Sequence, residues 1–304
     1  MSHASTSSDA IGKRAARELA AAGTVDRVLD AYALMRHTHQ RLEWICRRPC
    51  LVRRTLGYRC NEVVFASQRL PAVFDGVTIV HLSDLHADGI RDRGESLSEL
   101  LRSIRCDLCV ITGDFQDPDR CDPERAAAVS GRITRAVRPS IGCIAVLGNH
   151  DSAAIIPLLE REGITVLVND ARGFERRDTA IWIVGVDDDH YFHAADLDAA
   201  TAEVPEAEFQ ILLSHSPTRT IVEKAAAHGI DYFLCGHTHG GQVCLPRGRP
   251  LVSNCAATPD LLKGSWRFRN LHGYTSPGIG CSTLPTRLFC PPEVIVHRLR
   301  TASR

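Results

Sequence analysis

The sequence predicts a layered α/β domain, and three observations support this fold class. Apolar runs typical of buried strands alternate with stretches of helical periodicity from about residue 77 to residue 239. Short polar motifs follow several of these apolar runs directly. The chain has 304 residues, enough for one large domain with an appendage. We therefore expect an N-terminal helical appendage at residues 1–60 and the α/β domain at residues 61–304.

The appendage has helical character. Residues 1–9 are rich in Ser, Thr and Ala, which predicts disorder. From residue 11 to about residue 47 apolar side chains recur at spacings of three and four, which predicts an amphipathic helix. The pattern is interrupted near Gly23-Thr24, where Thr24 can cap a second helical piece. We expect the apolar stripe to pack on the domain, with a lipid headgroup region as the alternative.

A basic segment closes the appendage. Five arginines are interleaved with apolar residues there: Arg47, Arg48, Arg53, Arg54 and Arg59. A solvated charged face is the simpler interpretation. Peripheral contact with an anionic membrane surface, or with an acidic partner, is the alternative.

The predicted domain begins with two strands at residues 62–70 and 77–82, which we expect to be neighbours joined by a turn at Pro71 and Asp75-Gly76. The later strands are expected to end at Thr112, Leu147, Val186, Leu213 and Leu234. Helices are expected near residues 94–104, 122–137, 152–162, 194–203 and 218–228. After residue 242 the chain is rich in Gly, Pro and Ser as far as Leu284, and a last strand is expected at residues 293–299.

The composition narrows the function classes. Lys plus Arg and Asp plus Glu both number 36, so no net basic field would draw the protein to nucleic acid, and we expect no stable nucleic-acid complex. Cys106-x-x-Cys109 lies in an apolar run, which favours buried thiols over a zinc or redox pair. The N-terminus has no apolar segment of the signal-peptide type, and about 18 uncharged apolar residues never run together. We therefore expect a cytoplasmic protein that does not span the membrane.

Five polar motifs carry the candidate chemistry, and each follows a predicted strand. In chain order they are Asp84-Leu85-His86, Gly113-Asp114, Gly148-Asn149-His150-Asp151, Ser214-His215 and Gly236-His237-Thr238-His239. Ligands of layered α/β proteins bind beyond the carboxyl ends of strands, so the motifs should meet there. Residues i and i+2 of a strand share a face, so each Asp-x-His or His-x-His pair should aim at one point. Such carboxylates and imidazoles, with Asp114 as a bridge, suit a site for two metal ions.

A sixth polar segment, Asp187-Asp188-Asp189-His190, also follows a predicted strand. We expect it either to line the rim of the substrate site or to form a solvated turn.

The ordered set of motifs resembles the calcineurin-like metallophosphoesterase superfamily, over about residues 77–239. The resemblance implies an α/β sandwich of two sheets flanked by helices. It implies that one metal is held by Asp84, His86, Asp114 and His239, and the other by Asp114, Asn149, His215 and His237. The metals would be two divalent ions of Mn, Fe or Zn. The implied reaction is cleavage of a phosphodiester or pyrophosphate bond by a hydroxide that bridges the metals. His150 would face the phosphate, as acid to the leaving group or as a partner of the phosphoryl oxygens.

The branch of the superfamily is indicated by further motifs. The sequence after Gly113-Asp114 lacks the Asp-Arg-Gly of Ser/Thr protein phosphatases. It more closely resembles bacterial membrane-associated phosphodiesterases, through residues 82–86, 236–242 and 278–287. Some members cleave UDP-2,3-diacylglucosamine, a lipid-linked nucleotide, although the sequence shows no membrane anchor of the kind frequent in that branch. The alternatives are a nuclease or cyclic-nucleotide-type phosphodiesterase, or a non-catalytic metal-bound scaffold.

Overall fold

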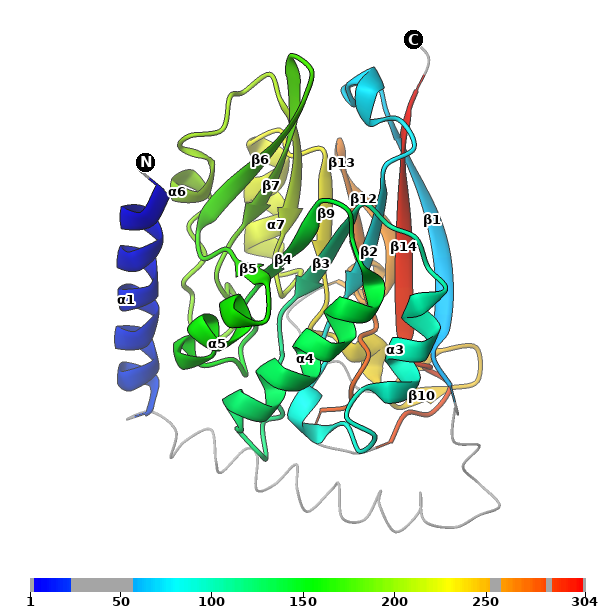
Figure 1. Cartoon of the computed structure of the whole chain (residues 1–304). Helices are drawn as coiled ribbons and strands as arrows, with labels where there is room; N and C mark the ends of the chain where they lie inside the picture. Colours follow the sequence, from blue (N-terminus) through cyan, green and yellow to red (C-terminus); the bar gives the residue numbers. More distant parts are fainter. Residues whose placement is uncertain (1–2, 23–56, 252–257, 283–285, 303–304) are drawn as a thin grey trace.

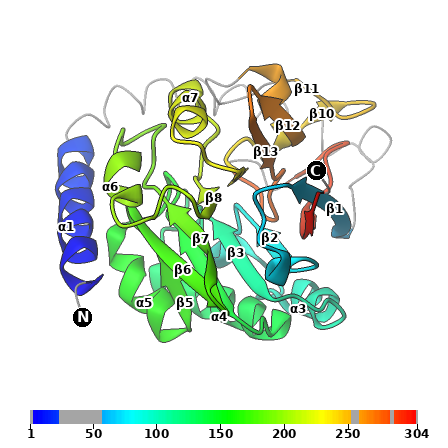
Figure 2. The same ribbon diagram turned by 90° about the horizontal axis from the view of Figure 1, so that it is seen from above.

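The computed structural model describes residues 3–22, 57–251, 258–282 and 286–302, and arranges their strands and helices in layers (Figure 1). Two six-stranded sheets form the centre, and helices cover the outer face of each sheet (Figure 2). The predicted two-sheet α/β sandwich flanked by helices is confirmed.

The first sheet has the strand order β1-β14-β2-β3-β4-β5. Its strands are β1 (Arg59–Ser67), β14 (Glu293–Thr301), β2 (Thr78–Leu82), β3 (Leu108–Thr112), β4 (Gly142–Val146) and β5 (Ile164–Val166). The prediction that the first two strands are neighbours is wrong, because β14 lies between them, parallel to β1 and antiparallel to β2. Burial explains the order: the first five residues of β14 are buried, whereas β1 is mostly exposed and forms the edge.

The second sheet has the strand order β12-β13-β9-β8-β7-β6. Its strands are β12 (Gly264–Phe268), β13 (Leu271–Thr275), β9 (Tyr232–Cys235), β8 (Phe209–Leu213), β7 (Thr179–Gly185) and β6 (Asp170–Arg176). Strands β7, β8, β9 and β13 are parallel, and β6 and β12 pair antiparallel at the edges. Three of these strands, β6, β12 and β13, are absent from the sequence prediction, because half-exposed edge strands and a Gly-containing strand lack a long apolar run. A small separate sheet pairs β10 (Cys244–Leu245) with β11 (Arg249–Pro250).

Helices α3 (Glu95–Arg102), α4 (Pro123–Val137) and α5 (Ile156–Arg161) pack on the first sheet, and α6 (Leu197–Thr201) and α7 (Arg219–Ala227) pack on the second. Short 3-10 turns lie at η1 (Ala72–Phe74), η2 (Ala87–Gly89), η3 (Ala153–Ile155), η4 (His239–Gly241) and η5 (Pro259–Leu261). One apolar cluster fills the space between the sheets, and one lies beneath each helical layer. Cys106 and Cys109 are buried free thiols, as the apolar run predicts.

Helix α1 (His3–Ala22) packs along one side of the sandwich (Figure 1). The prediction of disorder is wrong for His3–Asp9, because a helix that has formed its first turn extends at little further cost. Ala10, Ile11 and Ala15 contact the apolar cluster beneath α3, α4 and α5. The second predicted helical piece and the arginines at 47, 48, 53 and 54 lie outside the described residues, whereas Arg59 begins β1. None of the described helices combines the length and apolar character that a membrane crossing needs.

Candidate metal centre

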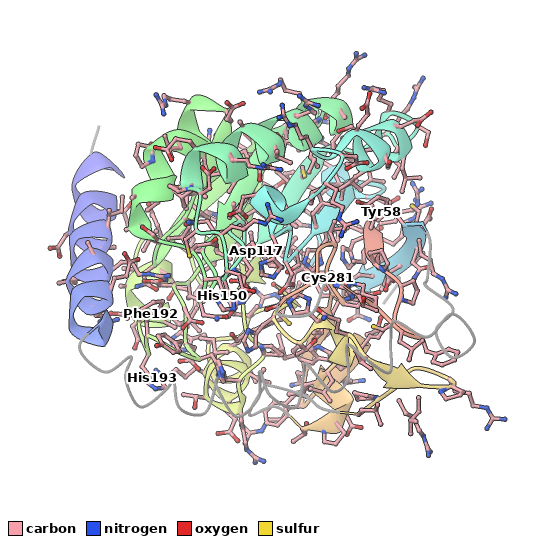
Figure 3. All side chains as sticks on the ribbon, turned by 90° about the horizontal axis from the view of Figure 1, so that it is seen from below. Tyr58, Asp117, His150, Phe192, His193 and Cys281 are labelled. Atoms are coloured by element: carbon pink, nitrogen blue, oxygen red, sulfur yellow. The ribbon has the colours of Figure 1, made fainter. Side chains whose placement is uncertain are left out.

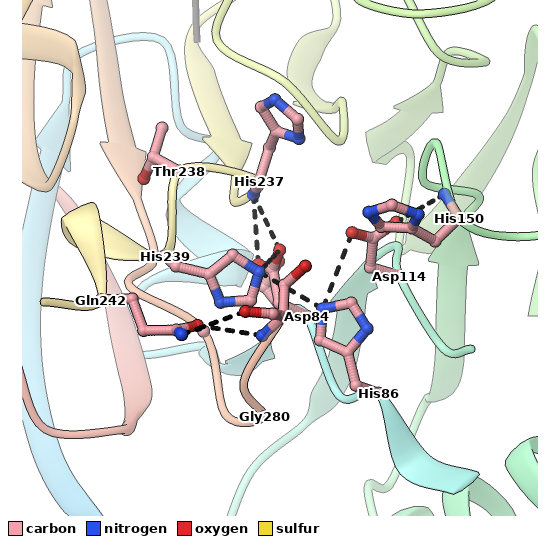
Figure 4. A network of polar contacts seen from close by, with 12 residues as sticks. Asp84, His86, Asp114, His150, His237, Thr238, His239, Gln242 and Gly280 are labelled. Atoms are coloured by element: carbon pink, nitrogen blue, oxygen red, sulfur yellow. Dashed lines mark hydrogen bonds and ion pairs between the residues drawn. The ribbon is translucent and has the colours of Figure 1, made fainter. Parts of the chain in front are cut away.

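The five polar motifs converge at one edge of the sandwich, where strands of both sheets end. Figure 4 labels residues of every motif except Ser214-His215. Asp84 and His86 follow β2, Asp114 follows β3, and Asn149 follows β4, all in the first sheet. The three remaining predicted ligands come from the second sheet: His215 follows β8, and His237 and His239 follow β9. The structure thus brings all seven predicted ligands together between the two sheets.

One donor cluster consists of four buried side chains whose nearest ligand atoms all lie within 4.8 Å of one another: Asp84, His86, Asp114 and His239. Nε2 of His239 lies 3.4 Å from Oδ1 of Asp84 and 3.3 Å from Nε2 of His86. Nε2 of His86 lies 3.8 Å from Oδ2 of Asp114. The ligand nitrogens and oxygens of these four side chains therefore face a common point.

A second donor cluster shares Asp114 with the first and adds His215 and His237, again within 4.8 Å. Nε2 of His215 lies 3.3 Å from Oδ2 of Asp114 and 3.2 Å from Nδ1 of His237. Oδ1 of Asn149 lies 3.0 Å from Nε2 of His215, which adds an amide oxygen. The position of Asp114 in both clusters is what a bridging carboxylate needs.

Five of the seven predicted ligands have a left-handed backbone. Asp84, His86, Asp114, His237 and His239 all have φ between 42° and 68°. L-residues rarely adopt this region, and such strain gathers at functional sites. The pairs at i and i+2 therefore do not share the face of an extended strand, as the sequence argument supposed. They meet because the chain turns sharply once each strand has ended.

Two glycines allow the strand ends to approach each other. Gly113 has φ 84°, and a Cβ there would lie 2.5 Å from the nitrogen of Gly148. A Cβ on Gly148 would collide with the carboxylate of Asp114. A side chain at either position would push β3 and β4 apart and move Asp114.

Backbone carbonyls orient two of the imidazoles. Nδ1 of His86 lies 2.7 Å from the carbonyl oxygen of Gln116, and Nδ1 of His215 lies 2.7 Å from that of Thr112. A carbonyl can only accept, so each Nδ1 carries the proton and each Nε2 is turned toward the cluster. Hydrogen bonds of this kind are typical of metal-binding histidines.

The carboxylate of Asp84 stands at the end of a buried chain of hydrogen bonds. Ser83 donates its hydroxyl to Oδ2 of Asp84 at 2.6 Å, and Thr112 donates to Ser83 at 2.8 Å. Nε2 of His81 lies 2.9 Å from the Thr112 hydroxyl oxygen and must therefore donate to it.

The chain continues between the sheets. Nδ1 of His81 lies 3.3 Å from Nε2 of His297, and Nδ1 of His297 lies 2.8 Å from the hydroxyl of Tyr232. Burial lowers the pKa of His81 to about 3 and that of His297 well below its ordinary value, so both rings are neutral at neutral pH. With one N–H on each ring, every hydrogen bond runs in the same direction, from Tyr232 toward Asp84. No periodic pattern in the sequence indicates this chain of hydrogen bonds.

Most imidazoles at the site are neutral and can bind a cation, and His215 is the exception. Burial lowers the pKa of His86 to about 4, and those of His237 and His239 well below 6.5, so these rings offer free electron pairs at neutral pH. Burial would lower the pKa of His215, but the carboxylates of Asp114 and Asp84 raise it to about 10, so a metal bound there would displace its Nε2 proton. Burial would raise the pKa of Asp114, but His215 and the other nearby imidazoles hold it well below its ordinary value. Two carboxylates, four imidazoles and an amide oxygen form a mixed set that fits two divalent transition-metal ions.

A family model described as calcineurin-like phosphoesterase matches residues 77–241, the segment that supplies all seven of these side chains. The chain belongs to this family. It is 29% identical to the metallophosphoesterase YkoQ of Bacillus subtilis over 73% of this chain and 83% of that protein. It is also 29% identical to YkuE of the same organism, over 80% and 86%. The phosphodiesterase YaeI of Escherichia coli is 31% identical over 53% of this chain and 58% of its own length. The protein is thus a metallophosphoesterase, a hydrolase of phosphoester bonds.

His150 lies beside the donor clusters of this metallophosphoesterase without belonging to either of them. Its ring centroid is 5.9 Å from that of His86, and its backbone N–H donates to Oδ1 of Asp114 at 3.0 Å (Figure 4). The ring is half-buried, so it borders both the donors and the solvent.

Asp151 has a structural role that the sequence pattern did not indicate. Its Oδ1 accepts the N–H groups of Phe115, at 2.7 Å, and Gln116, at 3.0 Å. Its Oδ2 accepts the N–H of Gly148 at 2.8 Å. This buried carboxylate thus ties the loop after β4, which carries Asn149 and His150, to the loop after β3.

Arg287 contacts the candidate site through one of the predicted ligands. The residue ends the motif at 278–287, and its buried guanidinium donates from Nε to the carbonyl oxygen of Gly280 at 2.9 Å. Its Nη2 lies 3.1 Å from Nδ1 of His239. The motif therefore packs against a predicted ligand, which its sequence position alone does not reveal.

The polar segment after β7 is not a solvated turn, because Asp187 and Asp188 are buried. Asp188 accepts the N–H groups of Tyr191, at 2.6 Å, and Phe192, at 2.8 Å, which folds the segment back on itself. The ring of His190 lies 4.5 Å from that of His237, so the segment borders the donor clusters as the rim interpretation expects.

Proposed function

We propose that this metallophosphoesterase is a dinuclear enzyme that cleaves phosphodiester or pyrophosphate bonds. One metal would be held by Asp84, His86, Asp114 and His239, and the other by Asp114, Asn149, His215 and His237. The observation that carries the proposal is the pair of buried donor clusters that share the Asp114 carboxylate. Mn, Fe and Zn all suit this donor set.

When bound, two divalent ions at such a site lower the pKa of a water molecule and balance the negative charge of the phosphoryl oxygens. The chain itself holds the seven donors in place through loops that Gly113, Gly148 and Asp151 keep close together. No nucleophilic side chain is needed in this scheme. The scheme therefore needs no covalent intermediate between enzyme and substrate.

His150 is the group that we propose to donate a proton to the leaving oxygen. Its half-buried ring borders the donor clusters without joining them, and within the described part of the chain its nitrogens make no hydrogen bond, so they can face the substrate. General acid catalysis of this kind contributes about 10²–10⁴-fold to a rate. Its contribution depends on how strongly the leaving oxygen needs a proton.

For the substrate, we propose a lipid-linked nucleotide such as UDP-2,3-diacylglucosamine, whose pyrophosphate bond is of the class that the site suits. The name of YaeI, a phosphodiesterase, supports a diester or anhydride over a phosphomonoester. A nuclease or cyclic-nucleotide-type phosphodiesterase is the competing assignment. The equal numbers of basic and acidic residues argue against a nuclease.

The test is hydrolysis of a substrate panel by the metal-loaded protein: a bis-aryl phosphodiester, UDP-2,3-diacylglucosamine, a cyclic nucleotide and single-stranded DNA. Each reaction is run with Mn(II), Fe(II) or Zn(II) after removal of bound metal. We expect cleavage of the aryl diester and the nucleotide lipid, and none of the DNA. If the protein binds two equivalents of metal yet cleaves nothing in the panel, it is a scaffold and the proposal fails.

We further propose that the enzyme works in the cytoplasm and reaches a lipid substrate through peripheral contact of its basic segment. Each basic residue near an anionic surface contributes on the order of 1 kcal/mol, so five arginines would suffice for salt-sensitive association. In a sedimentation assay with anionic vesicles, we expect binding at low salt that charge-neutral vesicles do not show. Replacing Arg47, Arg48, Arg53 and Arg54 by Gln should abolish it; unchanged binding would mean that the segment has another purpose.

A further inference from the structure

Helix α1 inserts one charged side chain into the protein interior. The side chain of Arg14 is 0% exposed, although the neighbouring Lys13 on the same helix is 69% exposed. Burying a guanidinium is strongly unfavourable unless its N–H groups are paired. The hydrogen-bond and ion-pair partners of Arg14 therefore indicate which segments of the protein α1 holds in place.

Two of these partners lie on either side of Asn149 and His150. Nη2 of Arg14 donates to the carbonyl oxygen of Gly148 at 2.9 Å and to that of Asp151 at 2.6 Å. One guanidinium nitrogen therefore holds both ends of the loop after β4.

Three more contacts keep the guanidinium in place. Nη1 pairs with the buried carboxylate of Asp187, and the ring of Phe192 lies 4.1 Å from the guanidinium carbon, beside α1 (Figure 3). Nε donates to Oε1 of Glu18 at 2.9 Å, and the same oxygen accepts the N–H of Ala153 at 2.9 Å. Helix α1 thus joins the loop after β4 to the loop after β7, which belongs to the second sheet.

We propose that Arg14 is a positioning residue, and that α1 sets the orientation of His150 through the loop after β4. Asp151 holds this loop against the loop after β3, and Arg14 holds it from the side of α1. The inference rests on the proposed function in taking His150 as the proton donor. A displacement of about 1 Å at a reacting group can reduce a rate about a hundredfold, so a helix outside the strand motifs can control the chemistry.

The test compares Arg14→Met with Lys13→Met in the full-length protein. Both substitutions remove one positive charge from α1, but only the first removes the contacts to the loop. Two quantities are measured: amide hydrogen exchange over residues 148–153, and kcat for an alkyl and a nitrophenyl phosphodiester.

We expect Arg14→Met to accelerate exchange in the loop and to lower kcat for the alkyl ester about tenfold or more, with a smaller loss for the nitrophenyl ester. A nitrophenolate leaves without protonation, so a misplaced acid matters less to it. Lys13→Met should match the wild type in both measurements. In a His150→Ala background, Arg14→Met should lower kcat for the alkyl ester little further, because both changes remove proton donation by a correctly placed His150.

The opposite results overturn the inference. One such result is unchanged amide exchange in the loop of Arg14→Met. The other is an equal loss of kcat for the alkyl ester when Arg14→Met is made in the wild type and in the His150→Ala background. Arg14→Lys covers the case in which Arg14→Met does not fold: it keeps the charge beside Asp187, but a single ammonium cannot reproduce the fork-shaped pairing, so loop exchange should lie between the other two. If the wild type cleaves neither ester, the proposed function fails, while the exchange comparison still decides the role of Arg14.

Discussion

Asp114 is the one side chain that both donor clusters share, so its removal should affect two metals at once. We predict that Asp114→Ala retains less than one equivalent of metal, because each site loses a charged donor that water replaces poorly. His86→Ala should lose metal mainly from one site and retain about one equivalent. Metal analysis of the two purified variants, beside the wild type, checks this. Two full equivalents in Asp114→Ala would contradict the bridging role.

His150 allows a second prediction at the scale of the residue, since it borders both donor clusters without joining them. We predict that His150→Ala keeps its metals and loses about 10²–10⁴-fold of its rate on alkyl phosphodiesters, but less on nitrophenyl esters. Steady-state kinetics on matched esters, with metal content measured in parallel, separates the roles. Equal losses on both esters would assign His150 to the phosphoryl oxygens, and loss of metal would place it among the ligands.

At the scale of the element, the hydrogen-bond chain links Tyr232 in β9 to Asp84 after β2 through side chains of β14, β2 and β3. Thr112, the last residue of β3, is its central link. Thr112→Val keeps the shape but cannot accept from His81 or donate to Ser83, whereas Thr112→Ser keeps the hydroxyl. We predict that only Thr112→Val weakens metal binding, about 10–100-fold, because Asp84 loses its fixed orientation. Titration of both metal-free variants with Mn(II) measures this, and equal affinities would show that the chain is only structural.

At the scale of the whole molecule, the imidazoles buried between the sheets make stability depend on pH. The pKa of His81 is about 3 in the folded protein because of burial, against an ordinary value of 6.5. The unfolded chain therefore binds more protons between these values, and stability falls as the pH is lowered through this window. Each such imidazole contributes a slope of about 1.4 kcal/mol per pH unit. We predict that metal-free wild type loses more stability than His81→Gln between about pH 7 and pH 5, as denaturant unfolding would show; parallel curves would refute it.

Much of the fold and of the candidate site could be predicted because its signals are local. A strand buried on both faces, such as β2, is a short apolar run, and a polar residue directly after it lies at the strand end by covalent connection. The strand ends, the helices between them and the seven side chains that gather at the candidate site could therefore be found along the chain. Parallel strands then bring their carboxyl ends to one edge, which explains why distant motifs meet.

Only the tertiary structure decided which distant segments lie side by side. No local pattern places β14 between β1 and β2, or brings His81, His297 and Tyr232 into one chain of hydrogen bonds. No local pattern indicates that Arg14 reaches the loop after β4, since its own helix reads as an ordinary amphipathic segment. The left-handed turns at five of the predicted ligands were also unpredictable, because they are imposed by the packing of the strand ends and not by the residues that adopt them. Residue types and spacing thus determined which donors are available, and long-range packing determined how they are aimed.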